Sequence, residues 1–175
     1  MTSLQFCPQC GKETLLAKSN KEFRCDCGFH FFQNVAAAVM VALCWQDEVL
    51  VAVRARNPGK GLLDLPGGFV DPGESLEATL VRELQEELGL DVSGCPVRYL
   101  GSFANTYPYD GITYHTCDTA FAINLTEKPD LRAADDVADC QWVKLGALSP
   151  SRFAFASTRT AITLLTQQPT SSFRL

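Results

Sequence analysis

The sequence predicts an α/β protein, an α/β/α sandwich with a mixed β-sheet, preceded by a small cysteine-rich unit. Three observations support this prediction. Apolar runs of strand length recur through residues 34–175, an amphipathic helical run interrupts them, and a second helical run follows near the end. Half of the eight cysteines lie within residues 1–33. We therefore expect two domains, residues 1–33 and residues 34–175.

The expected strands of the larger domain are apolar or β-branched runs separated by turn residues. They are Val35–Trp45, Val49–Arg54, Phe69–Val70, Val97–Tyr107, Tyr114–Leu125 and Cys140–Leu145. Turns are expected at Gln46–Glu48 and at Pro108–Gly111, each between two strands. A terminal helix is expected over Ser157–Gln167. Its inward-facing side chains would be Ala161, Ile162, Leu164 and Leu165.

The central helix follows two Pro/Gly turns, Leu65–Gly68 and Asp71–Gly73. Ser75 and the residues after it resemble a capped first turn. Gly89 suits the end of the helix, because glycine readily adopts the left-handed conformation found there. An apolar stripe recurs at every fourth position, so one side of the helix packs on a core. This stripe consists of Leu76, Leu80, Leu84 and Leu88.

Acidic side chains gather on the same helix, where Glu83, Glu86 and Glu87 fall within an arc of about 100°. Like charges at these spacings destabilise a helix by roughly 0.2–0.5 kcal/mol per pair, and Arg82 offsets only part of this. A bound Mg²⁺ or Mn²⁺ offsets far more, because hard cations take carboxylate oxygens. Such a cation polarises a phosphoryl oxygen and lowers the pKa of a bound water. The alternative interpretation is a solvated acidic face.

The order of the residues distinguishes these two interpretations. The spacing is Gly68-x5-Glu74-x7-Arg82-Glu83-Leu84-x-Glu86-Glu87-x-Gly89-Leu90. It matches every fixed position of the Nudix box, and the chain is identified as resembling the Nudix hydrolases. These enzymes cleave a nucleoside diphosphate linked to another group, with water attacking a phosphorus and Mg²⁺ or Mn²⁺ bound. The resemblance also implies the α/β/α sandwich.

The resemblance implies a role for each matched polar position. The metal-binding carboxylates of the family correspond to Glu83, Glu86 and Glu87. Arg82 corresponds to the residue that holds a box glutamate by a salt bridge, and the Gly68 carbonyl corresponds to a frequent metal ligand. Glu74 corresponds to a position that supports the metal in some relatives and is structural in others.

The general base is left open by the resemblance, because relatives use either a box glutamate or an acid on a later loop. Acids on such a loop are Glu127, Asp130, Asp135 and Asp136. Asp135 and Asp136 lie where many relatives place an acid ahead of a tryptophan, here Trp142. They are therefore the candidates outside the box, and a solvated loop acid is the alternative interpretation for each.

Two cysteine pairs predict a metal site near the N-terminus. Cys7 and Cys10 are separated by two residues, and Cys25 and Cys27 by one. A glycine follows each pair and permits the tight backbone that directs thiolates at one ion. The segment resembles a zinc ribbon, in which four sulfurs would hold a structural Zn²⁺ with no open position for water. His30 is the alternative fourth ligand, because the spacing of the second pair is less common.

A disulfide framework is the other interpretation of the cysteines. The first residues lack the basic region and the apolar run of a secretory signal. The remaining cysteines lie singly in or near expected strands, at Cys44, Cys95, Cys117 and Cys140. We therefore expect reduced thiols, a cytoplasmic location and a structural Zn²⁺.

A cysteine ribbon followed directly by the core resembles one branch of the Nudix hydrolases. This zinc-ribbon branch has NADH pyrophosphatase and ADP-ribose pyrophosphatase relatives, and the segment Phe31–Val35 is similar to that group. The chain lacks the SQPWPFP-type segment that NADH pyrophosphatases carry after the box. The branch therefore does not fix the substrate.

Candidate substrate contacts flank two expected loops. Arg54 and Arg56 follow a strand and suit contacts with phosphates. Tyr107, Tyr114 and His115 surround the hairpin turn and suit stacking on a base. Solvated loop charges and ordinary hairpin packing are the alternative interpretations.

We expect a metal-dependent pyrophosphohydrolase that cleaves ADP-ribose, a related dinucleotide or a nucleotide sugar to a nucleoside monophosphate and a phosphorylated product. The alternative is a nucleotide- or nucleic-acid-binding module that uses the zinc ribbon. A net charge of −5 and a pI near 5.0 provide no broad basic surface, which argues against nucleic acid as a partner. No apolar run approaches the roughly 20 residues of a membrane span. The resemblance leaves a homodimer open.

Overall fold

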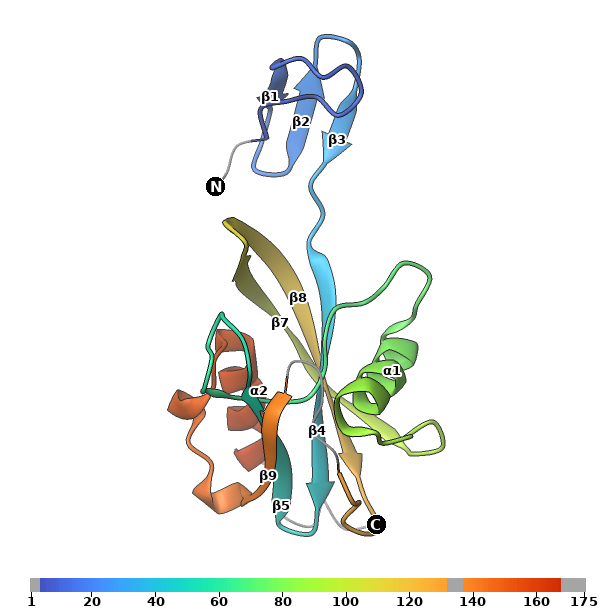
Figure 1. The fold of residues 1–175 in the computed structure, drawn as a ribbon, viewed down its shortest axis with the longest axis vertical. Coiled ribbons are helices and arrows are strands. Elements are labelled where there is room, and N and C mark those ends of the chain that lie inside the picture. The colour runs from blue at the N-terminus through green and yellow to red at the C-terminus, as the bar shows by residue number, and fades with distance from the viewer. Residues whose placement is uncertain (1–3, 132–136, 168–175) are drawn as a thin grey trace.

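The computed structural model describes residues 4–131 and 137–167, which form two β-sheets (Figure 1). The smaller sheet is antiparallel and consists of β1 (Leu15–Ala17), β2 (Glu22–Cys25) and β3 (His30–Phe32). Residues 33–35 connect it directly to the first strand of the larger sheet. The expected domain boundary between residues 33 and 34 falls in this connection and stays a prediction.

The larger sheet is mixed, as expected. Its strands are β4 (Ala36–Trp45), β5 (Glu48–Arg54), β6 (Leu63–Asp64), β7 (Val97–Tyr109), β8 (Ile112–Asn124) and β9 (Val137–Lys144). Their order is β6-β5-β4-β8-β7, and β9 pairs with β5. β4 and β8 run parallel, whereas the other neighbouring strands are antiparallel.

One helix covers each face of the larger sheet, with α1 (Leu76–Leu88) and α2 (Ala156–Gln167) on opposite sides of β4 (Figure 1). β4 is an almost uninterrupted apolar run because its side chains are buried on both faces. Alternate side chains enter opposite cores. Val39, Val41 and Leu43 belong to the core under α1, and Met40, Ala42 and Cys44 belong to the core under α2. The arrangement confirms the expected α/β/α sandwich.

Helix α1 begins and ends at the residues that the sequence predicts. The Ser75 hydroxyl accepts a hydrogen bond from the Ala78 amide at 3.2 Å, and Gly89 ends the helix with a φ of 68°. α1 has 13 residues and α2 has 12. Neither of them, nor any other helix in the described ranges, is long and apolar enough to cross a membrane.

Some elements differ from the prediction. The strand expected at Phe69–Val70 is wrong, because the short segment between two Pro/Gly turns forms only a single bridge, Phe69 with Ala38. The two-residue strand β6 lies before it instead. Leu164 is 37% exposed because it lies at the edge of the buried stripe of α2. The hairpin turn is tighter than expected, since Asp110 and Gly111 both have positive φ and strand pairing continues to Tyr109.

We expect the substitution Leu84→Ala to lower the free energy of unfolding by about 2–5 kcal/mol, because Leu84 is fully buried between α1 and the sheet. Urea denaturation followed by circular dichroism measures the change. Leu164→Ala, on the partly exposed edge of α2, is the matched control and should cost much less. Equal losses for the two variants would contradict the assigned packing.

Candidate active site and cysteine cluster

Two carboxylates of α1 and one from the loop before it surround a single guanidinium. Arg82 Nε and Nη2 donate to the two carboxylate oxygens of Glu74 at 2.8 and 3.0 Å. Arg82 Nη1 donates to Glu83 at 2.9 Å and to Glu86 at 3.1 Å. Nη2 also donates to the Phe69 carbonyl at 3.0 Å. A guanidinium can make all these bonds because its five N–H donors lie in one plane.

Glu74 connects the loop before α1 to the first turns of the helix. One of its oxygens accepts from the Thr79 hydroxyl at 2.8 Å and from the Asp71 amide at 3.2 Å, besides Arg82. The hydrogen bonds from Arg82 hold the pKa of the Glu74 carboxyl at about 2, well below its usual value. Glu74 is therefore a carboxylate whose contacts lie within the loop and the helix.

Two glycines bring the loop backbone against the helix carboxylates. Gly67 has a φ of 141°, and a Cβ built on it would overlap the Val39 carbonyl. A Cβ built on Gly68 would overlap the Glu83 carboxylate. The Gly67 amide also donates to Glu87 Oε2 at 2.9 Å. No other residue type fits at these two positions without displacing the β4 backbone or the Glu83 carboxylate.

The same residues offer the oxygen donors that a hard divalent cation takes, although their side chains are not clustered as the four cysteines are. Glu83, Glu86 and Glu87 offer carboxylate oxygens, and the Gly68 carbonyl has a second lone pair besides the one that accepts from the Val39 amide. An all-oxygen donor set of this kind suits Mg²⁺ or Mn²⁺. The Glu86 side chain is 49% exposed, whereas Glu87 is buried, so the set extends from the surface of α1 into the protein.

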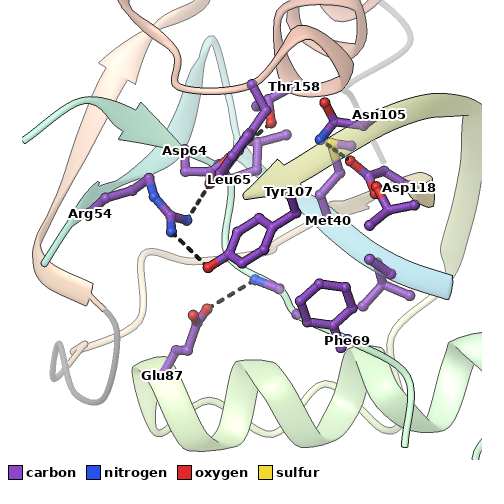
Figure 2. A pocket seen from close by; sticks show the side chains of 16 residues that line it. Met40, Arg54, Asp64, Leu65, Phe69, Glu87, Asn105, Tyr107, Asp118 and Thr158 are labelled. Atoms are coloured by element: carbon purple, nitrogen blue, oxygen red, sulfur yellow. Dashed lines mark hydrogen bonds and ion pairs between the residues drawn. The ribbon is translucent and has the colours of Figure 1, made fainter. Parts of the chain in front are cut away.

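A cavity of about 130 Å³ lies beside Gly67, Gly68 and Glu87 (Figure 2). Arg54 lines this cavity, and its guanidinium is bonded to other side chains of the protein. Its Nη1 forms an ion pair with Asp64 at 2.9 Å, and its guanidinium lies 4.8 Å from the centroid of the Phe155 ring. Nη2 approaches the Tyr107 hydroxyl at 3.4 Å. Arg54 and Tyr107, both expected as substrate contacts, are thus brought together in one cavity.

Five polar residues of this cavity are absent from the sequence-based prediction: Asp64, Asn105, Thr116, Asp118 and Thr158. Asp64 is held by Arg54 and by the Thr158 hydroxyl. Burial raises the pKa of the Asp64 carboxyl above its usual range, and the charge of Arg54 acts in the opposite direction. Asp118 is only 8% exposed. A carboxylate inside an apolar strand was the available signal, since buried charges are rare without a partner or a ligand.

A second cavity of about 480 Å³ shares Phe69 and Tyr107 with the first one. Its other lining residues are Ala36, Arg56, Asn57, Val70, Tyr109 and Tyr114. Phe69 packs edge-on against Tyr107, with ring centroids 5.4 Å apart. The expected contacts Arg56 and Tyr114 therefore lie together here, whereas His115 is exposed on β8 and lines neither cavity. Asp135 and Asp136 lie outside the described residues.

The four N-terminal cysteines converge, with all four Sγ atoms within 4.8 Å of one another. Cys7 and Cys27 are 3.7 Å apart at their Sγ atoms, and so are Cys10 and Cys25. A zinc ion with Zn–S bonds of about 2.3 Å has a tetrahedron edge of about 3.8 Å, so this spacing suits such a site. Among residues 4–131 and 137–167, no other group of three or more His, Cys, Asp or Glu side chains is clustered in this way.

His30, the alternative fourth ligand, lies on β3 outside this cluster. Its Nε2 is 2.9 Å from Glu22 Oε1, and its ring packs on Phe32. The Thr14 hydroxyl, 3.0 Å from Cys25 Sγ, lowers the pKa of that thiol to about 6. Because the thiolate is the form that binds a metal, this contact favours ligation through Cys25. The geometry thus favours four sulfurs over a mixed site.

The segment that contains the larger sheet and both cavities matches a known protein family. A family model of the NUDIX domain matches residues 34–163, from just before β4 into α2. The chain belongs to the NUDIX family. The NUDIX match leaves the three-stranded cysteine unit outside its limits.

Relatives agree with this NUDIX assignment. The NAD-capped RNA hydrolase NudC of Vibrio atlanticus is 31% identical over 147 residues, which are 83% of this chain and 51% of the relative. The chain spans about half the length of the curated relatives it matches.

Two solved structures show the same fold. A NUDIX hydrolase from Nitrosomonas europaea has a TM-score of 0.67 and 21% identity, covering 94% of this chain and 91% of that one. A bifunctional NMN adenylyltransferase/ADP ribose pyrophosphatase from Francisella tularensis has a TM-score of 0.61 and 24% identity, covering 78% and 42%.

The contribution of Glu74 to stability should depend on pH in a defined direction. Its pKa in the folded protein, about 2, is below the ordinary 4.5, so its stabilising effect is complete above pH 4.5 and is lost as the pH falls toward 2. We expect the difference in unfolding free energy between wild type and Glu74→Gln to become smaller as the pH falls from 4.5 toward 2. Urea denaturation at a series of pH values measures it.

Glu77→Gln is the control for loss of charge alone, because Glu77 is an exposed carboxylate of the same helix. A difference between wild type and Glu74→Gln that stays constant between pH 6 and pH 2 would show that Arg82 does not hold the Glu74 carboxylate as described.

Proposed function

We propose that this NUDIX chain is a metal-dependent pyrophosphohydrolase that cleaves a nucleoside diphosphate linked to another group, such as ADP-ribose or a related dinucleotide. One observation carries the proposal. The carboxylates of α1 lie against the Gly67–Gly68 backbone, beside a cavity with aromatic walls. Family membership and the similarity to a NAD-capped RNA hydrolase support it.

Glu83, Glu86 and Glu87, with the Gly68 carbonyl, would hold Mg²⁺ or Mn²⁺. When bound, such a cation polarises the phosphoryl oxygens and neutralises charge on the diphosphate. Arg82 positions Glu83 and Glu86 through hydrogen bonds of 2.9 and 3.1 Å. Glu86 is the proposed general base. It is half exposed, and in the described chain only its Oε2 is hydrogen-bonded, which leaves Oε1 to accept a proton from water.

The two cavities suit the two parts of a dinucleotide. They meet at Phe69 and Tyr107, so a diphosphate near α1 could extend one group into each. Tyr109 and Tyr114 offer ring faces for a base, and Arg56 offers a cation for a phosphate. The products would be a nucleoside monophosphate and a phosphorylated second group.

We expect hydrolysis that requires Mg²⁺ or Mn²⁺ and stops in EDTA. The substrates to compare are ADP-ribose, NAD, NADH, FAD, nucleotide sugars, nucleoside triphosphates and NAD-capped RNA, with release of AMP or phosphate as the readout. The double substitution Glu86→Gln/Glu87→Gln should lower kcat/KM by about 100-fold or more, because two proposed cation ligands lose their charge. Glu77→Gln should retain activity, because it removes an exposed carboxylate of the same helix outside the proposed set.

Full activity in the folded double variant would overturn the proposal. So would activity that is unaffected by EDTA. Silence toward every one of these substrates, from protein saturated with Mg²⁺ or Mn²⁺, would instead favour a nucleotide-binding role without hydrolysis.

We further propose that the four cysteines hold a structural Zn²⁺. The core of the small sheet consists of two of these cysteines with Leu15 and Phe23, against which Phe29 and Phe31 pack. So few apolar side chains do not hold a domain together without a crosslink or a metal. A site of four thiolates also implies a reducing compartment.

We expect one Zn²⁺ per chain in wild type and a loss of most of it in Cys10→Ser, measured by atomic emission on purified protein. Cys117→Ser, which replaces an exposed cysteine on β8, should retain full zinc content. The β4–α2 unit should stay folded in Cys10→Ser, because its two cores do not include the cysteine cluster. Equal zinc content in the two variants would exclude the site.

A further inference from the structure

One wall of the 130 Å³ cavity is polar, and nothing in the chemistry of the α1 carboxylates requires this. β8 contributes Thr116 and Asp118, which are two residues apart and therefore lie on the same face of the sheet. That face is turned toward α2, as the packing of Ala120 shows. On the neighbouring strand β4 the register partners are alanines, whose small side chains leave the space in front of the polar wall open.

Asp118 is partly held by the protein and partly available. Its Oδ2 accepts hydrogen bonds from the Ser157 hydroxyl at 2.6 Å and from the Asn105 amide at 2.8 Å. In the described part of the chain, Oδ1 accepts no hydrogen bond and no cationic side chain pairs with the carboxylate. A carboxylate has acceptor sites on both oxygens, so Asp118 has a fixed orientation and one free acceptor in the cavity.

The Thr116 hydroxyl is a second polar group without a partner in the described chain, besides Asp118 Oδ1. It is only 4% exposed, and its hydroxyl has no hydrogen-bond partner among the residues that the structure describes. A buried unsatisfied hydroxyl lowers stability, and valine would fill the same volume without this loss. The folded chain alone therefore gives no reason for a hydroxyl at this position, whereas a ligand that completes its hydrogen bond does.

We propose that Asp118 and Thr116 form a specificity site for the neutral, N–H-bearing end of the substrate, an amino or carboxamide group on a ring. The identity of the substrate as a dinucleotide rests on the proposed function. The amino or amide N–H donates to Asp118 Oδ1, and the Thr116 hydroxyl bonds the neighbouring acceptor of the same group. Because Asp118 carries no cation partner in the described chain, the site rejects a phosphate or a carboxylate.

Three probes distinguish the two sources of such a group. They are NAD, its analogue with a carboxylate in place of the carboxamide, and its analogue with hypoxanthine in place of adenine. We expect wild type to bind NAD about 10- to 100-fold more tightly than one of the two analogues, measured by calorimetry in EDTA. Weak binding of the carboxylate analogue places the carboxamide in the cavity, and weak binding of the hypoxanthine analogue places the adenine amino group there.

Two variants separate recognition from folding. Asp118→Asn keeps the size of the side chain but can donate a hydrogen bond, so it should reduce the preference for NAD to less than about threefold. Thr116→Val should weaken NAD binding while leaving the Tm unchanged or higher, which a structural role does not predict. Thr119→Val is the control, because Thr119 is a buried threonine on the opposite face of β8 and lines neither cavity.

Equal binding of the three probes by wild type overturns the inference, and so does an unchanged preference in folded Asp118→Asn. A complete absence of probe binding also overturns it. Hydrolysis, measured in parallel with Mg²⁺, tests the proposed function separately. Turnover without the preference refutes only the specificity site, and an Asp118-dependent preference without turnover refutes only the hydrolase.

Discussion

Several carboxylates that repel one another are held on one helix and its preceding loop by the guanidinium of Arg82. Its planar fork bonds Glu74, Glu83 and Glu86 at once, together with the Phe69 carbonyl. A lysine could not replace it, because an ammonium is a compact point charge without the fixed fork. The loop before α1 and the last turns of α1 are therefore linked through one side chain. The geometry of the proposed cation site depends on this linkage.

The apolar core fixes the other side of the same site. The amides of Val39 and Val41 on β4 donate to the carbonyls of Gly68 and Pro66, so the glycine loop is bonded to the central strand. Leu84, one residue after Glu83, is fully buried in the core under α1. The carboxylates thus have a position that follows from the packing of α1 on β4. Packing and site chemistry are coupled here through residues adjacent in sequence.

The sequence predicts the parts of the fold that are long or strongly periodic. β4 and α1 follow from an apolar run and from a four-residue leucine repeat, and the box acids follow from their spacing. The hairpin turn is harder, because the expected strands stop at Tyr107 and resume at Tyr114. These two residues do pair, but the pairing continues beyond them to Tyr109 and Ile112, so the turn is shorter than expected.

The unpredicted part of the site depends on contacts between elements. Asp118 is oriented by Asn105 and by Ser157, which are 13 and 39 residues away along the chain. No local pattern reveals such contacts. His115 lines neither cavity, because successive residues of a strand point to opposite faces, so Tyr114 and His115 do not enter one cavity. Its role as a substrate contact stays a prediction.

The β7–β8 hairpin has a consequence for how this protein could diversify. Asn105, Tyr107, Tyr109, Tyr114, Thr116 and Asp118 all belong to this one hairpin. The carboxylates of the proposed cation site belong to a helix elsewhere in the chain. A single exchanged segment, residues 105–118, would therefore carry these six cavity residues from one NUDIX chain to another. Exchange of this hairpin would therefore change the residues proposed to contact the substrate and leave the proposed cation ligands on α1 unchanged.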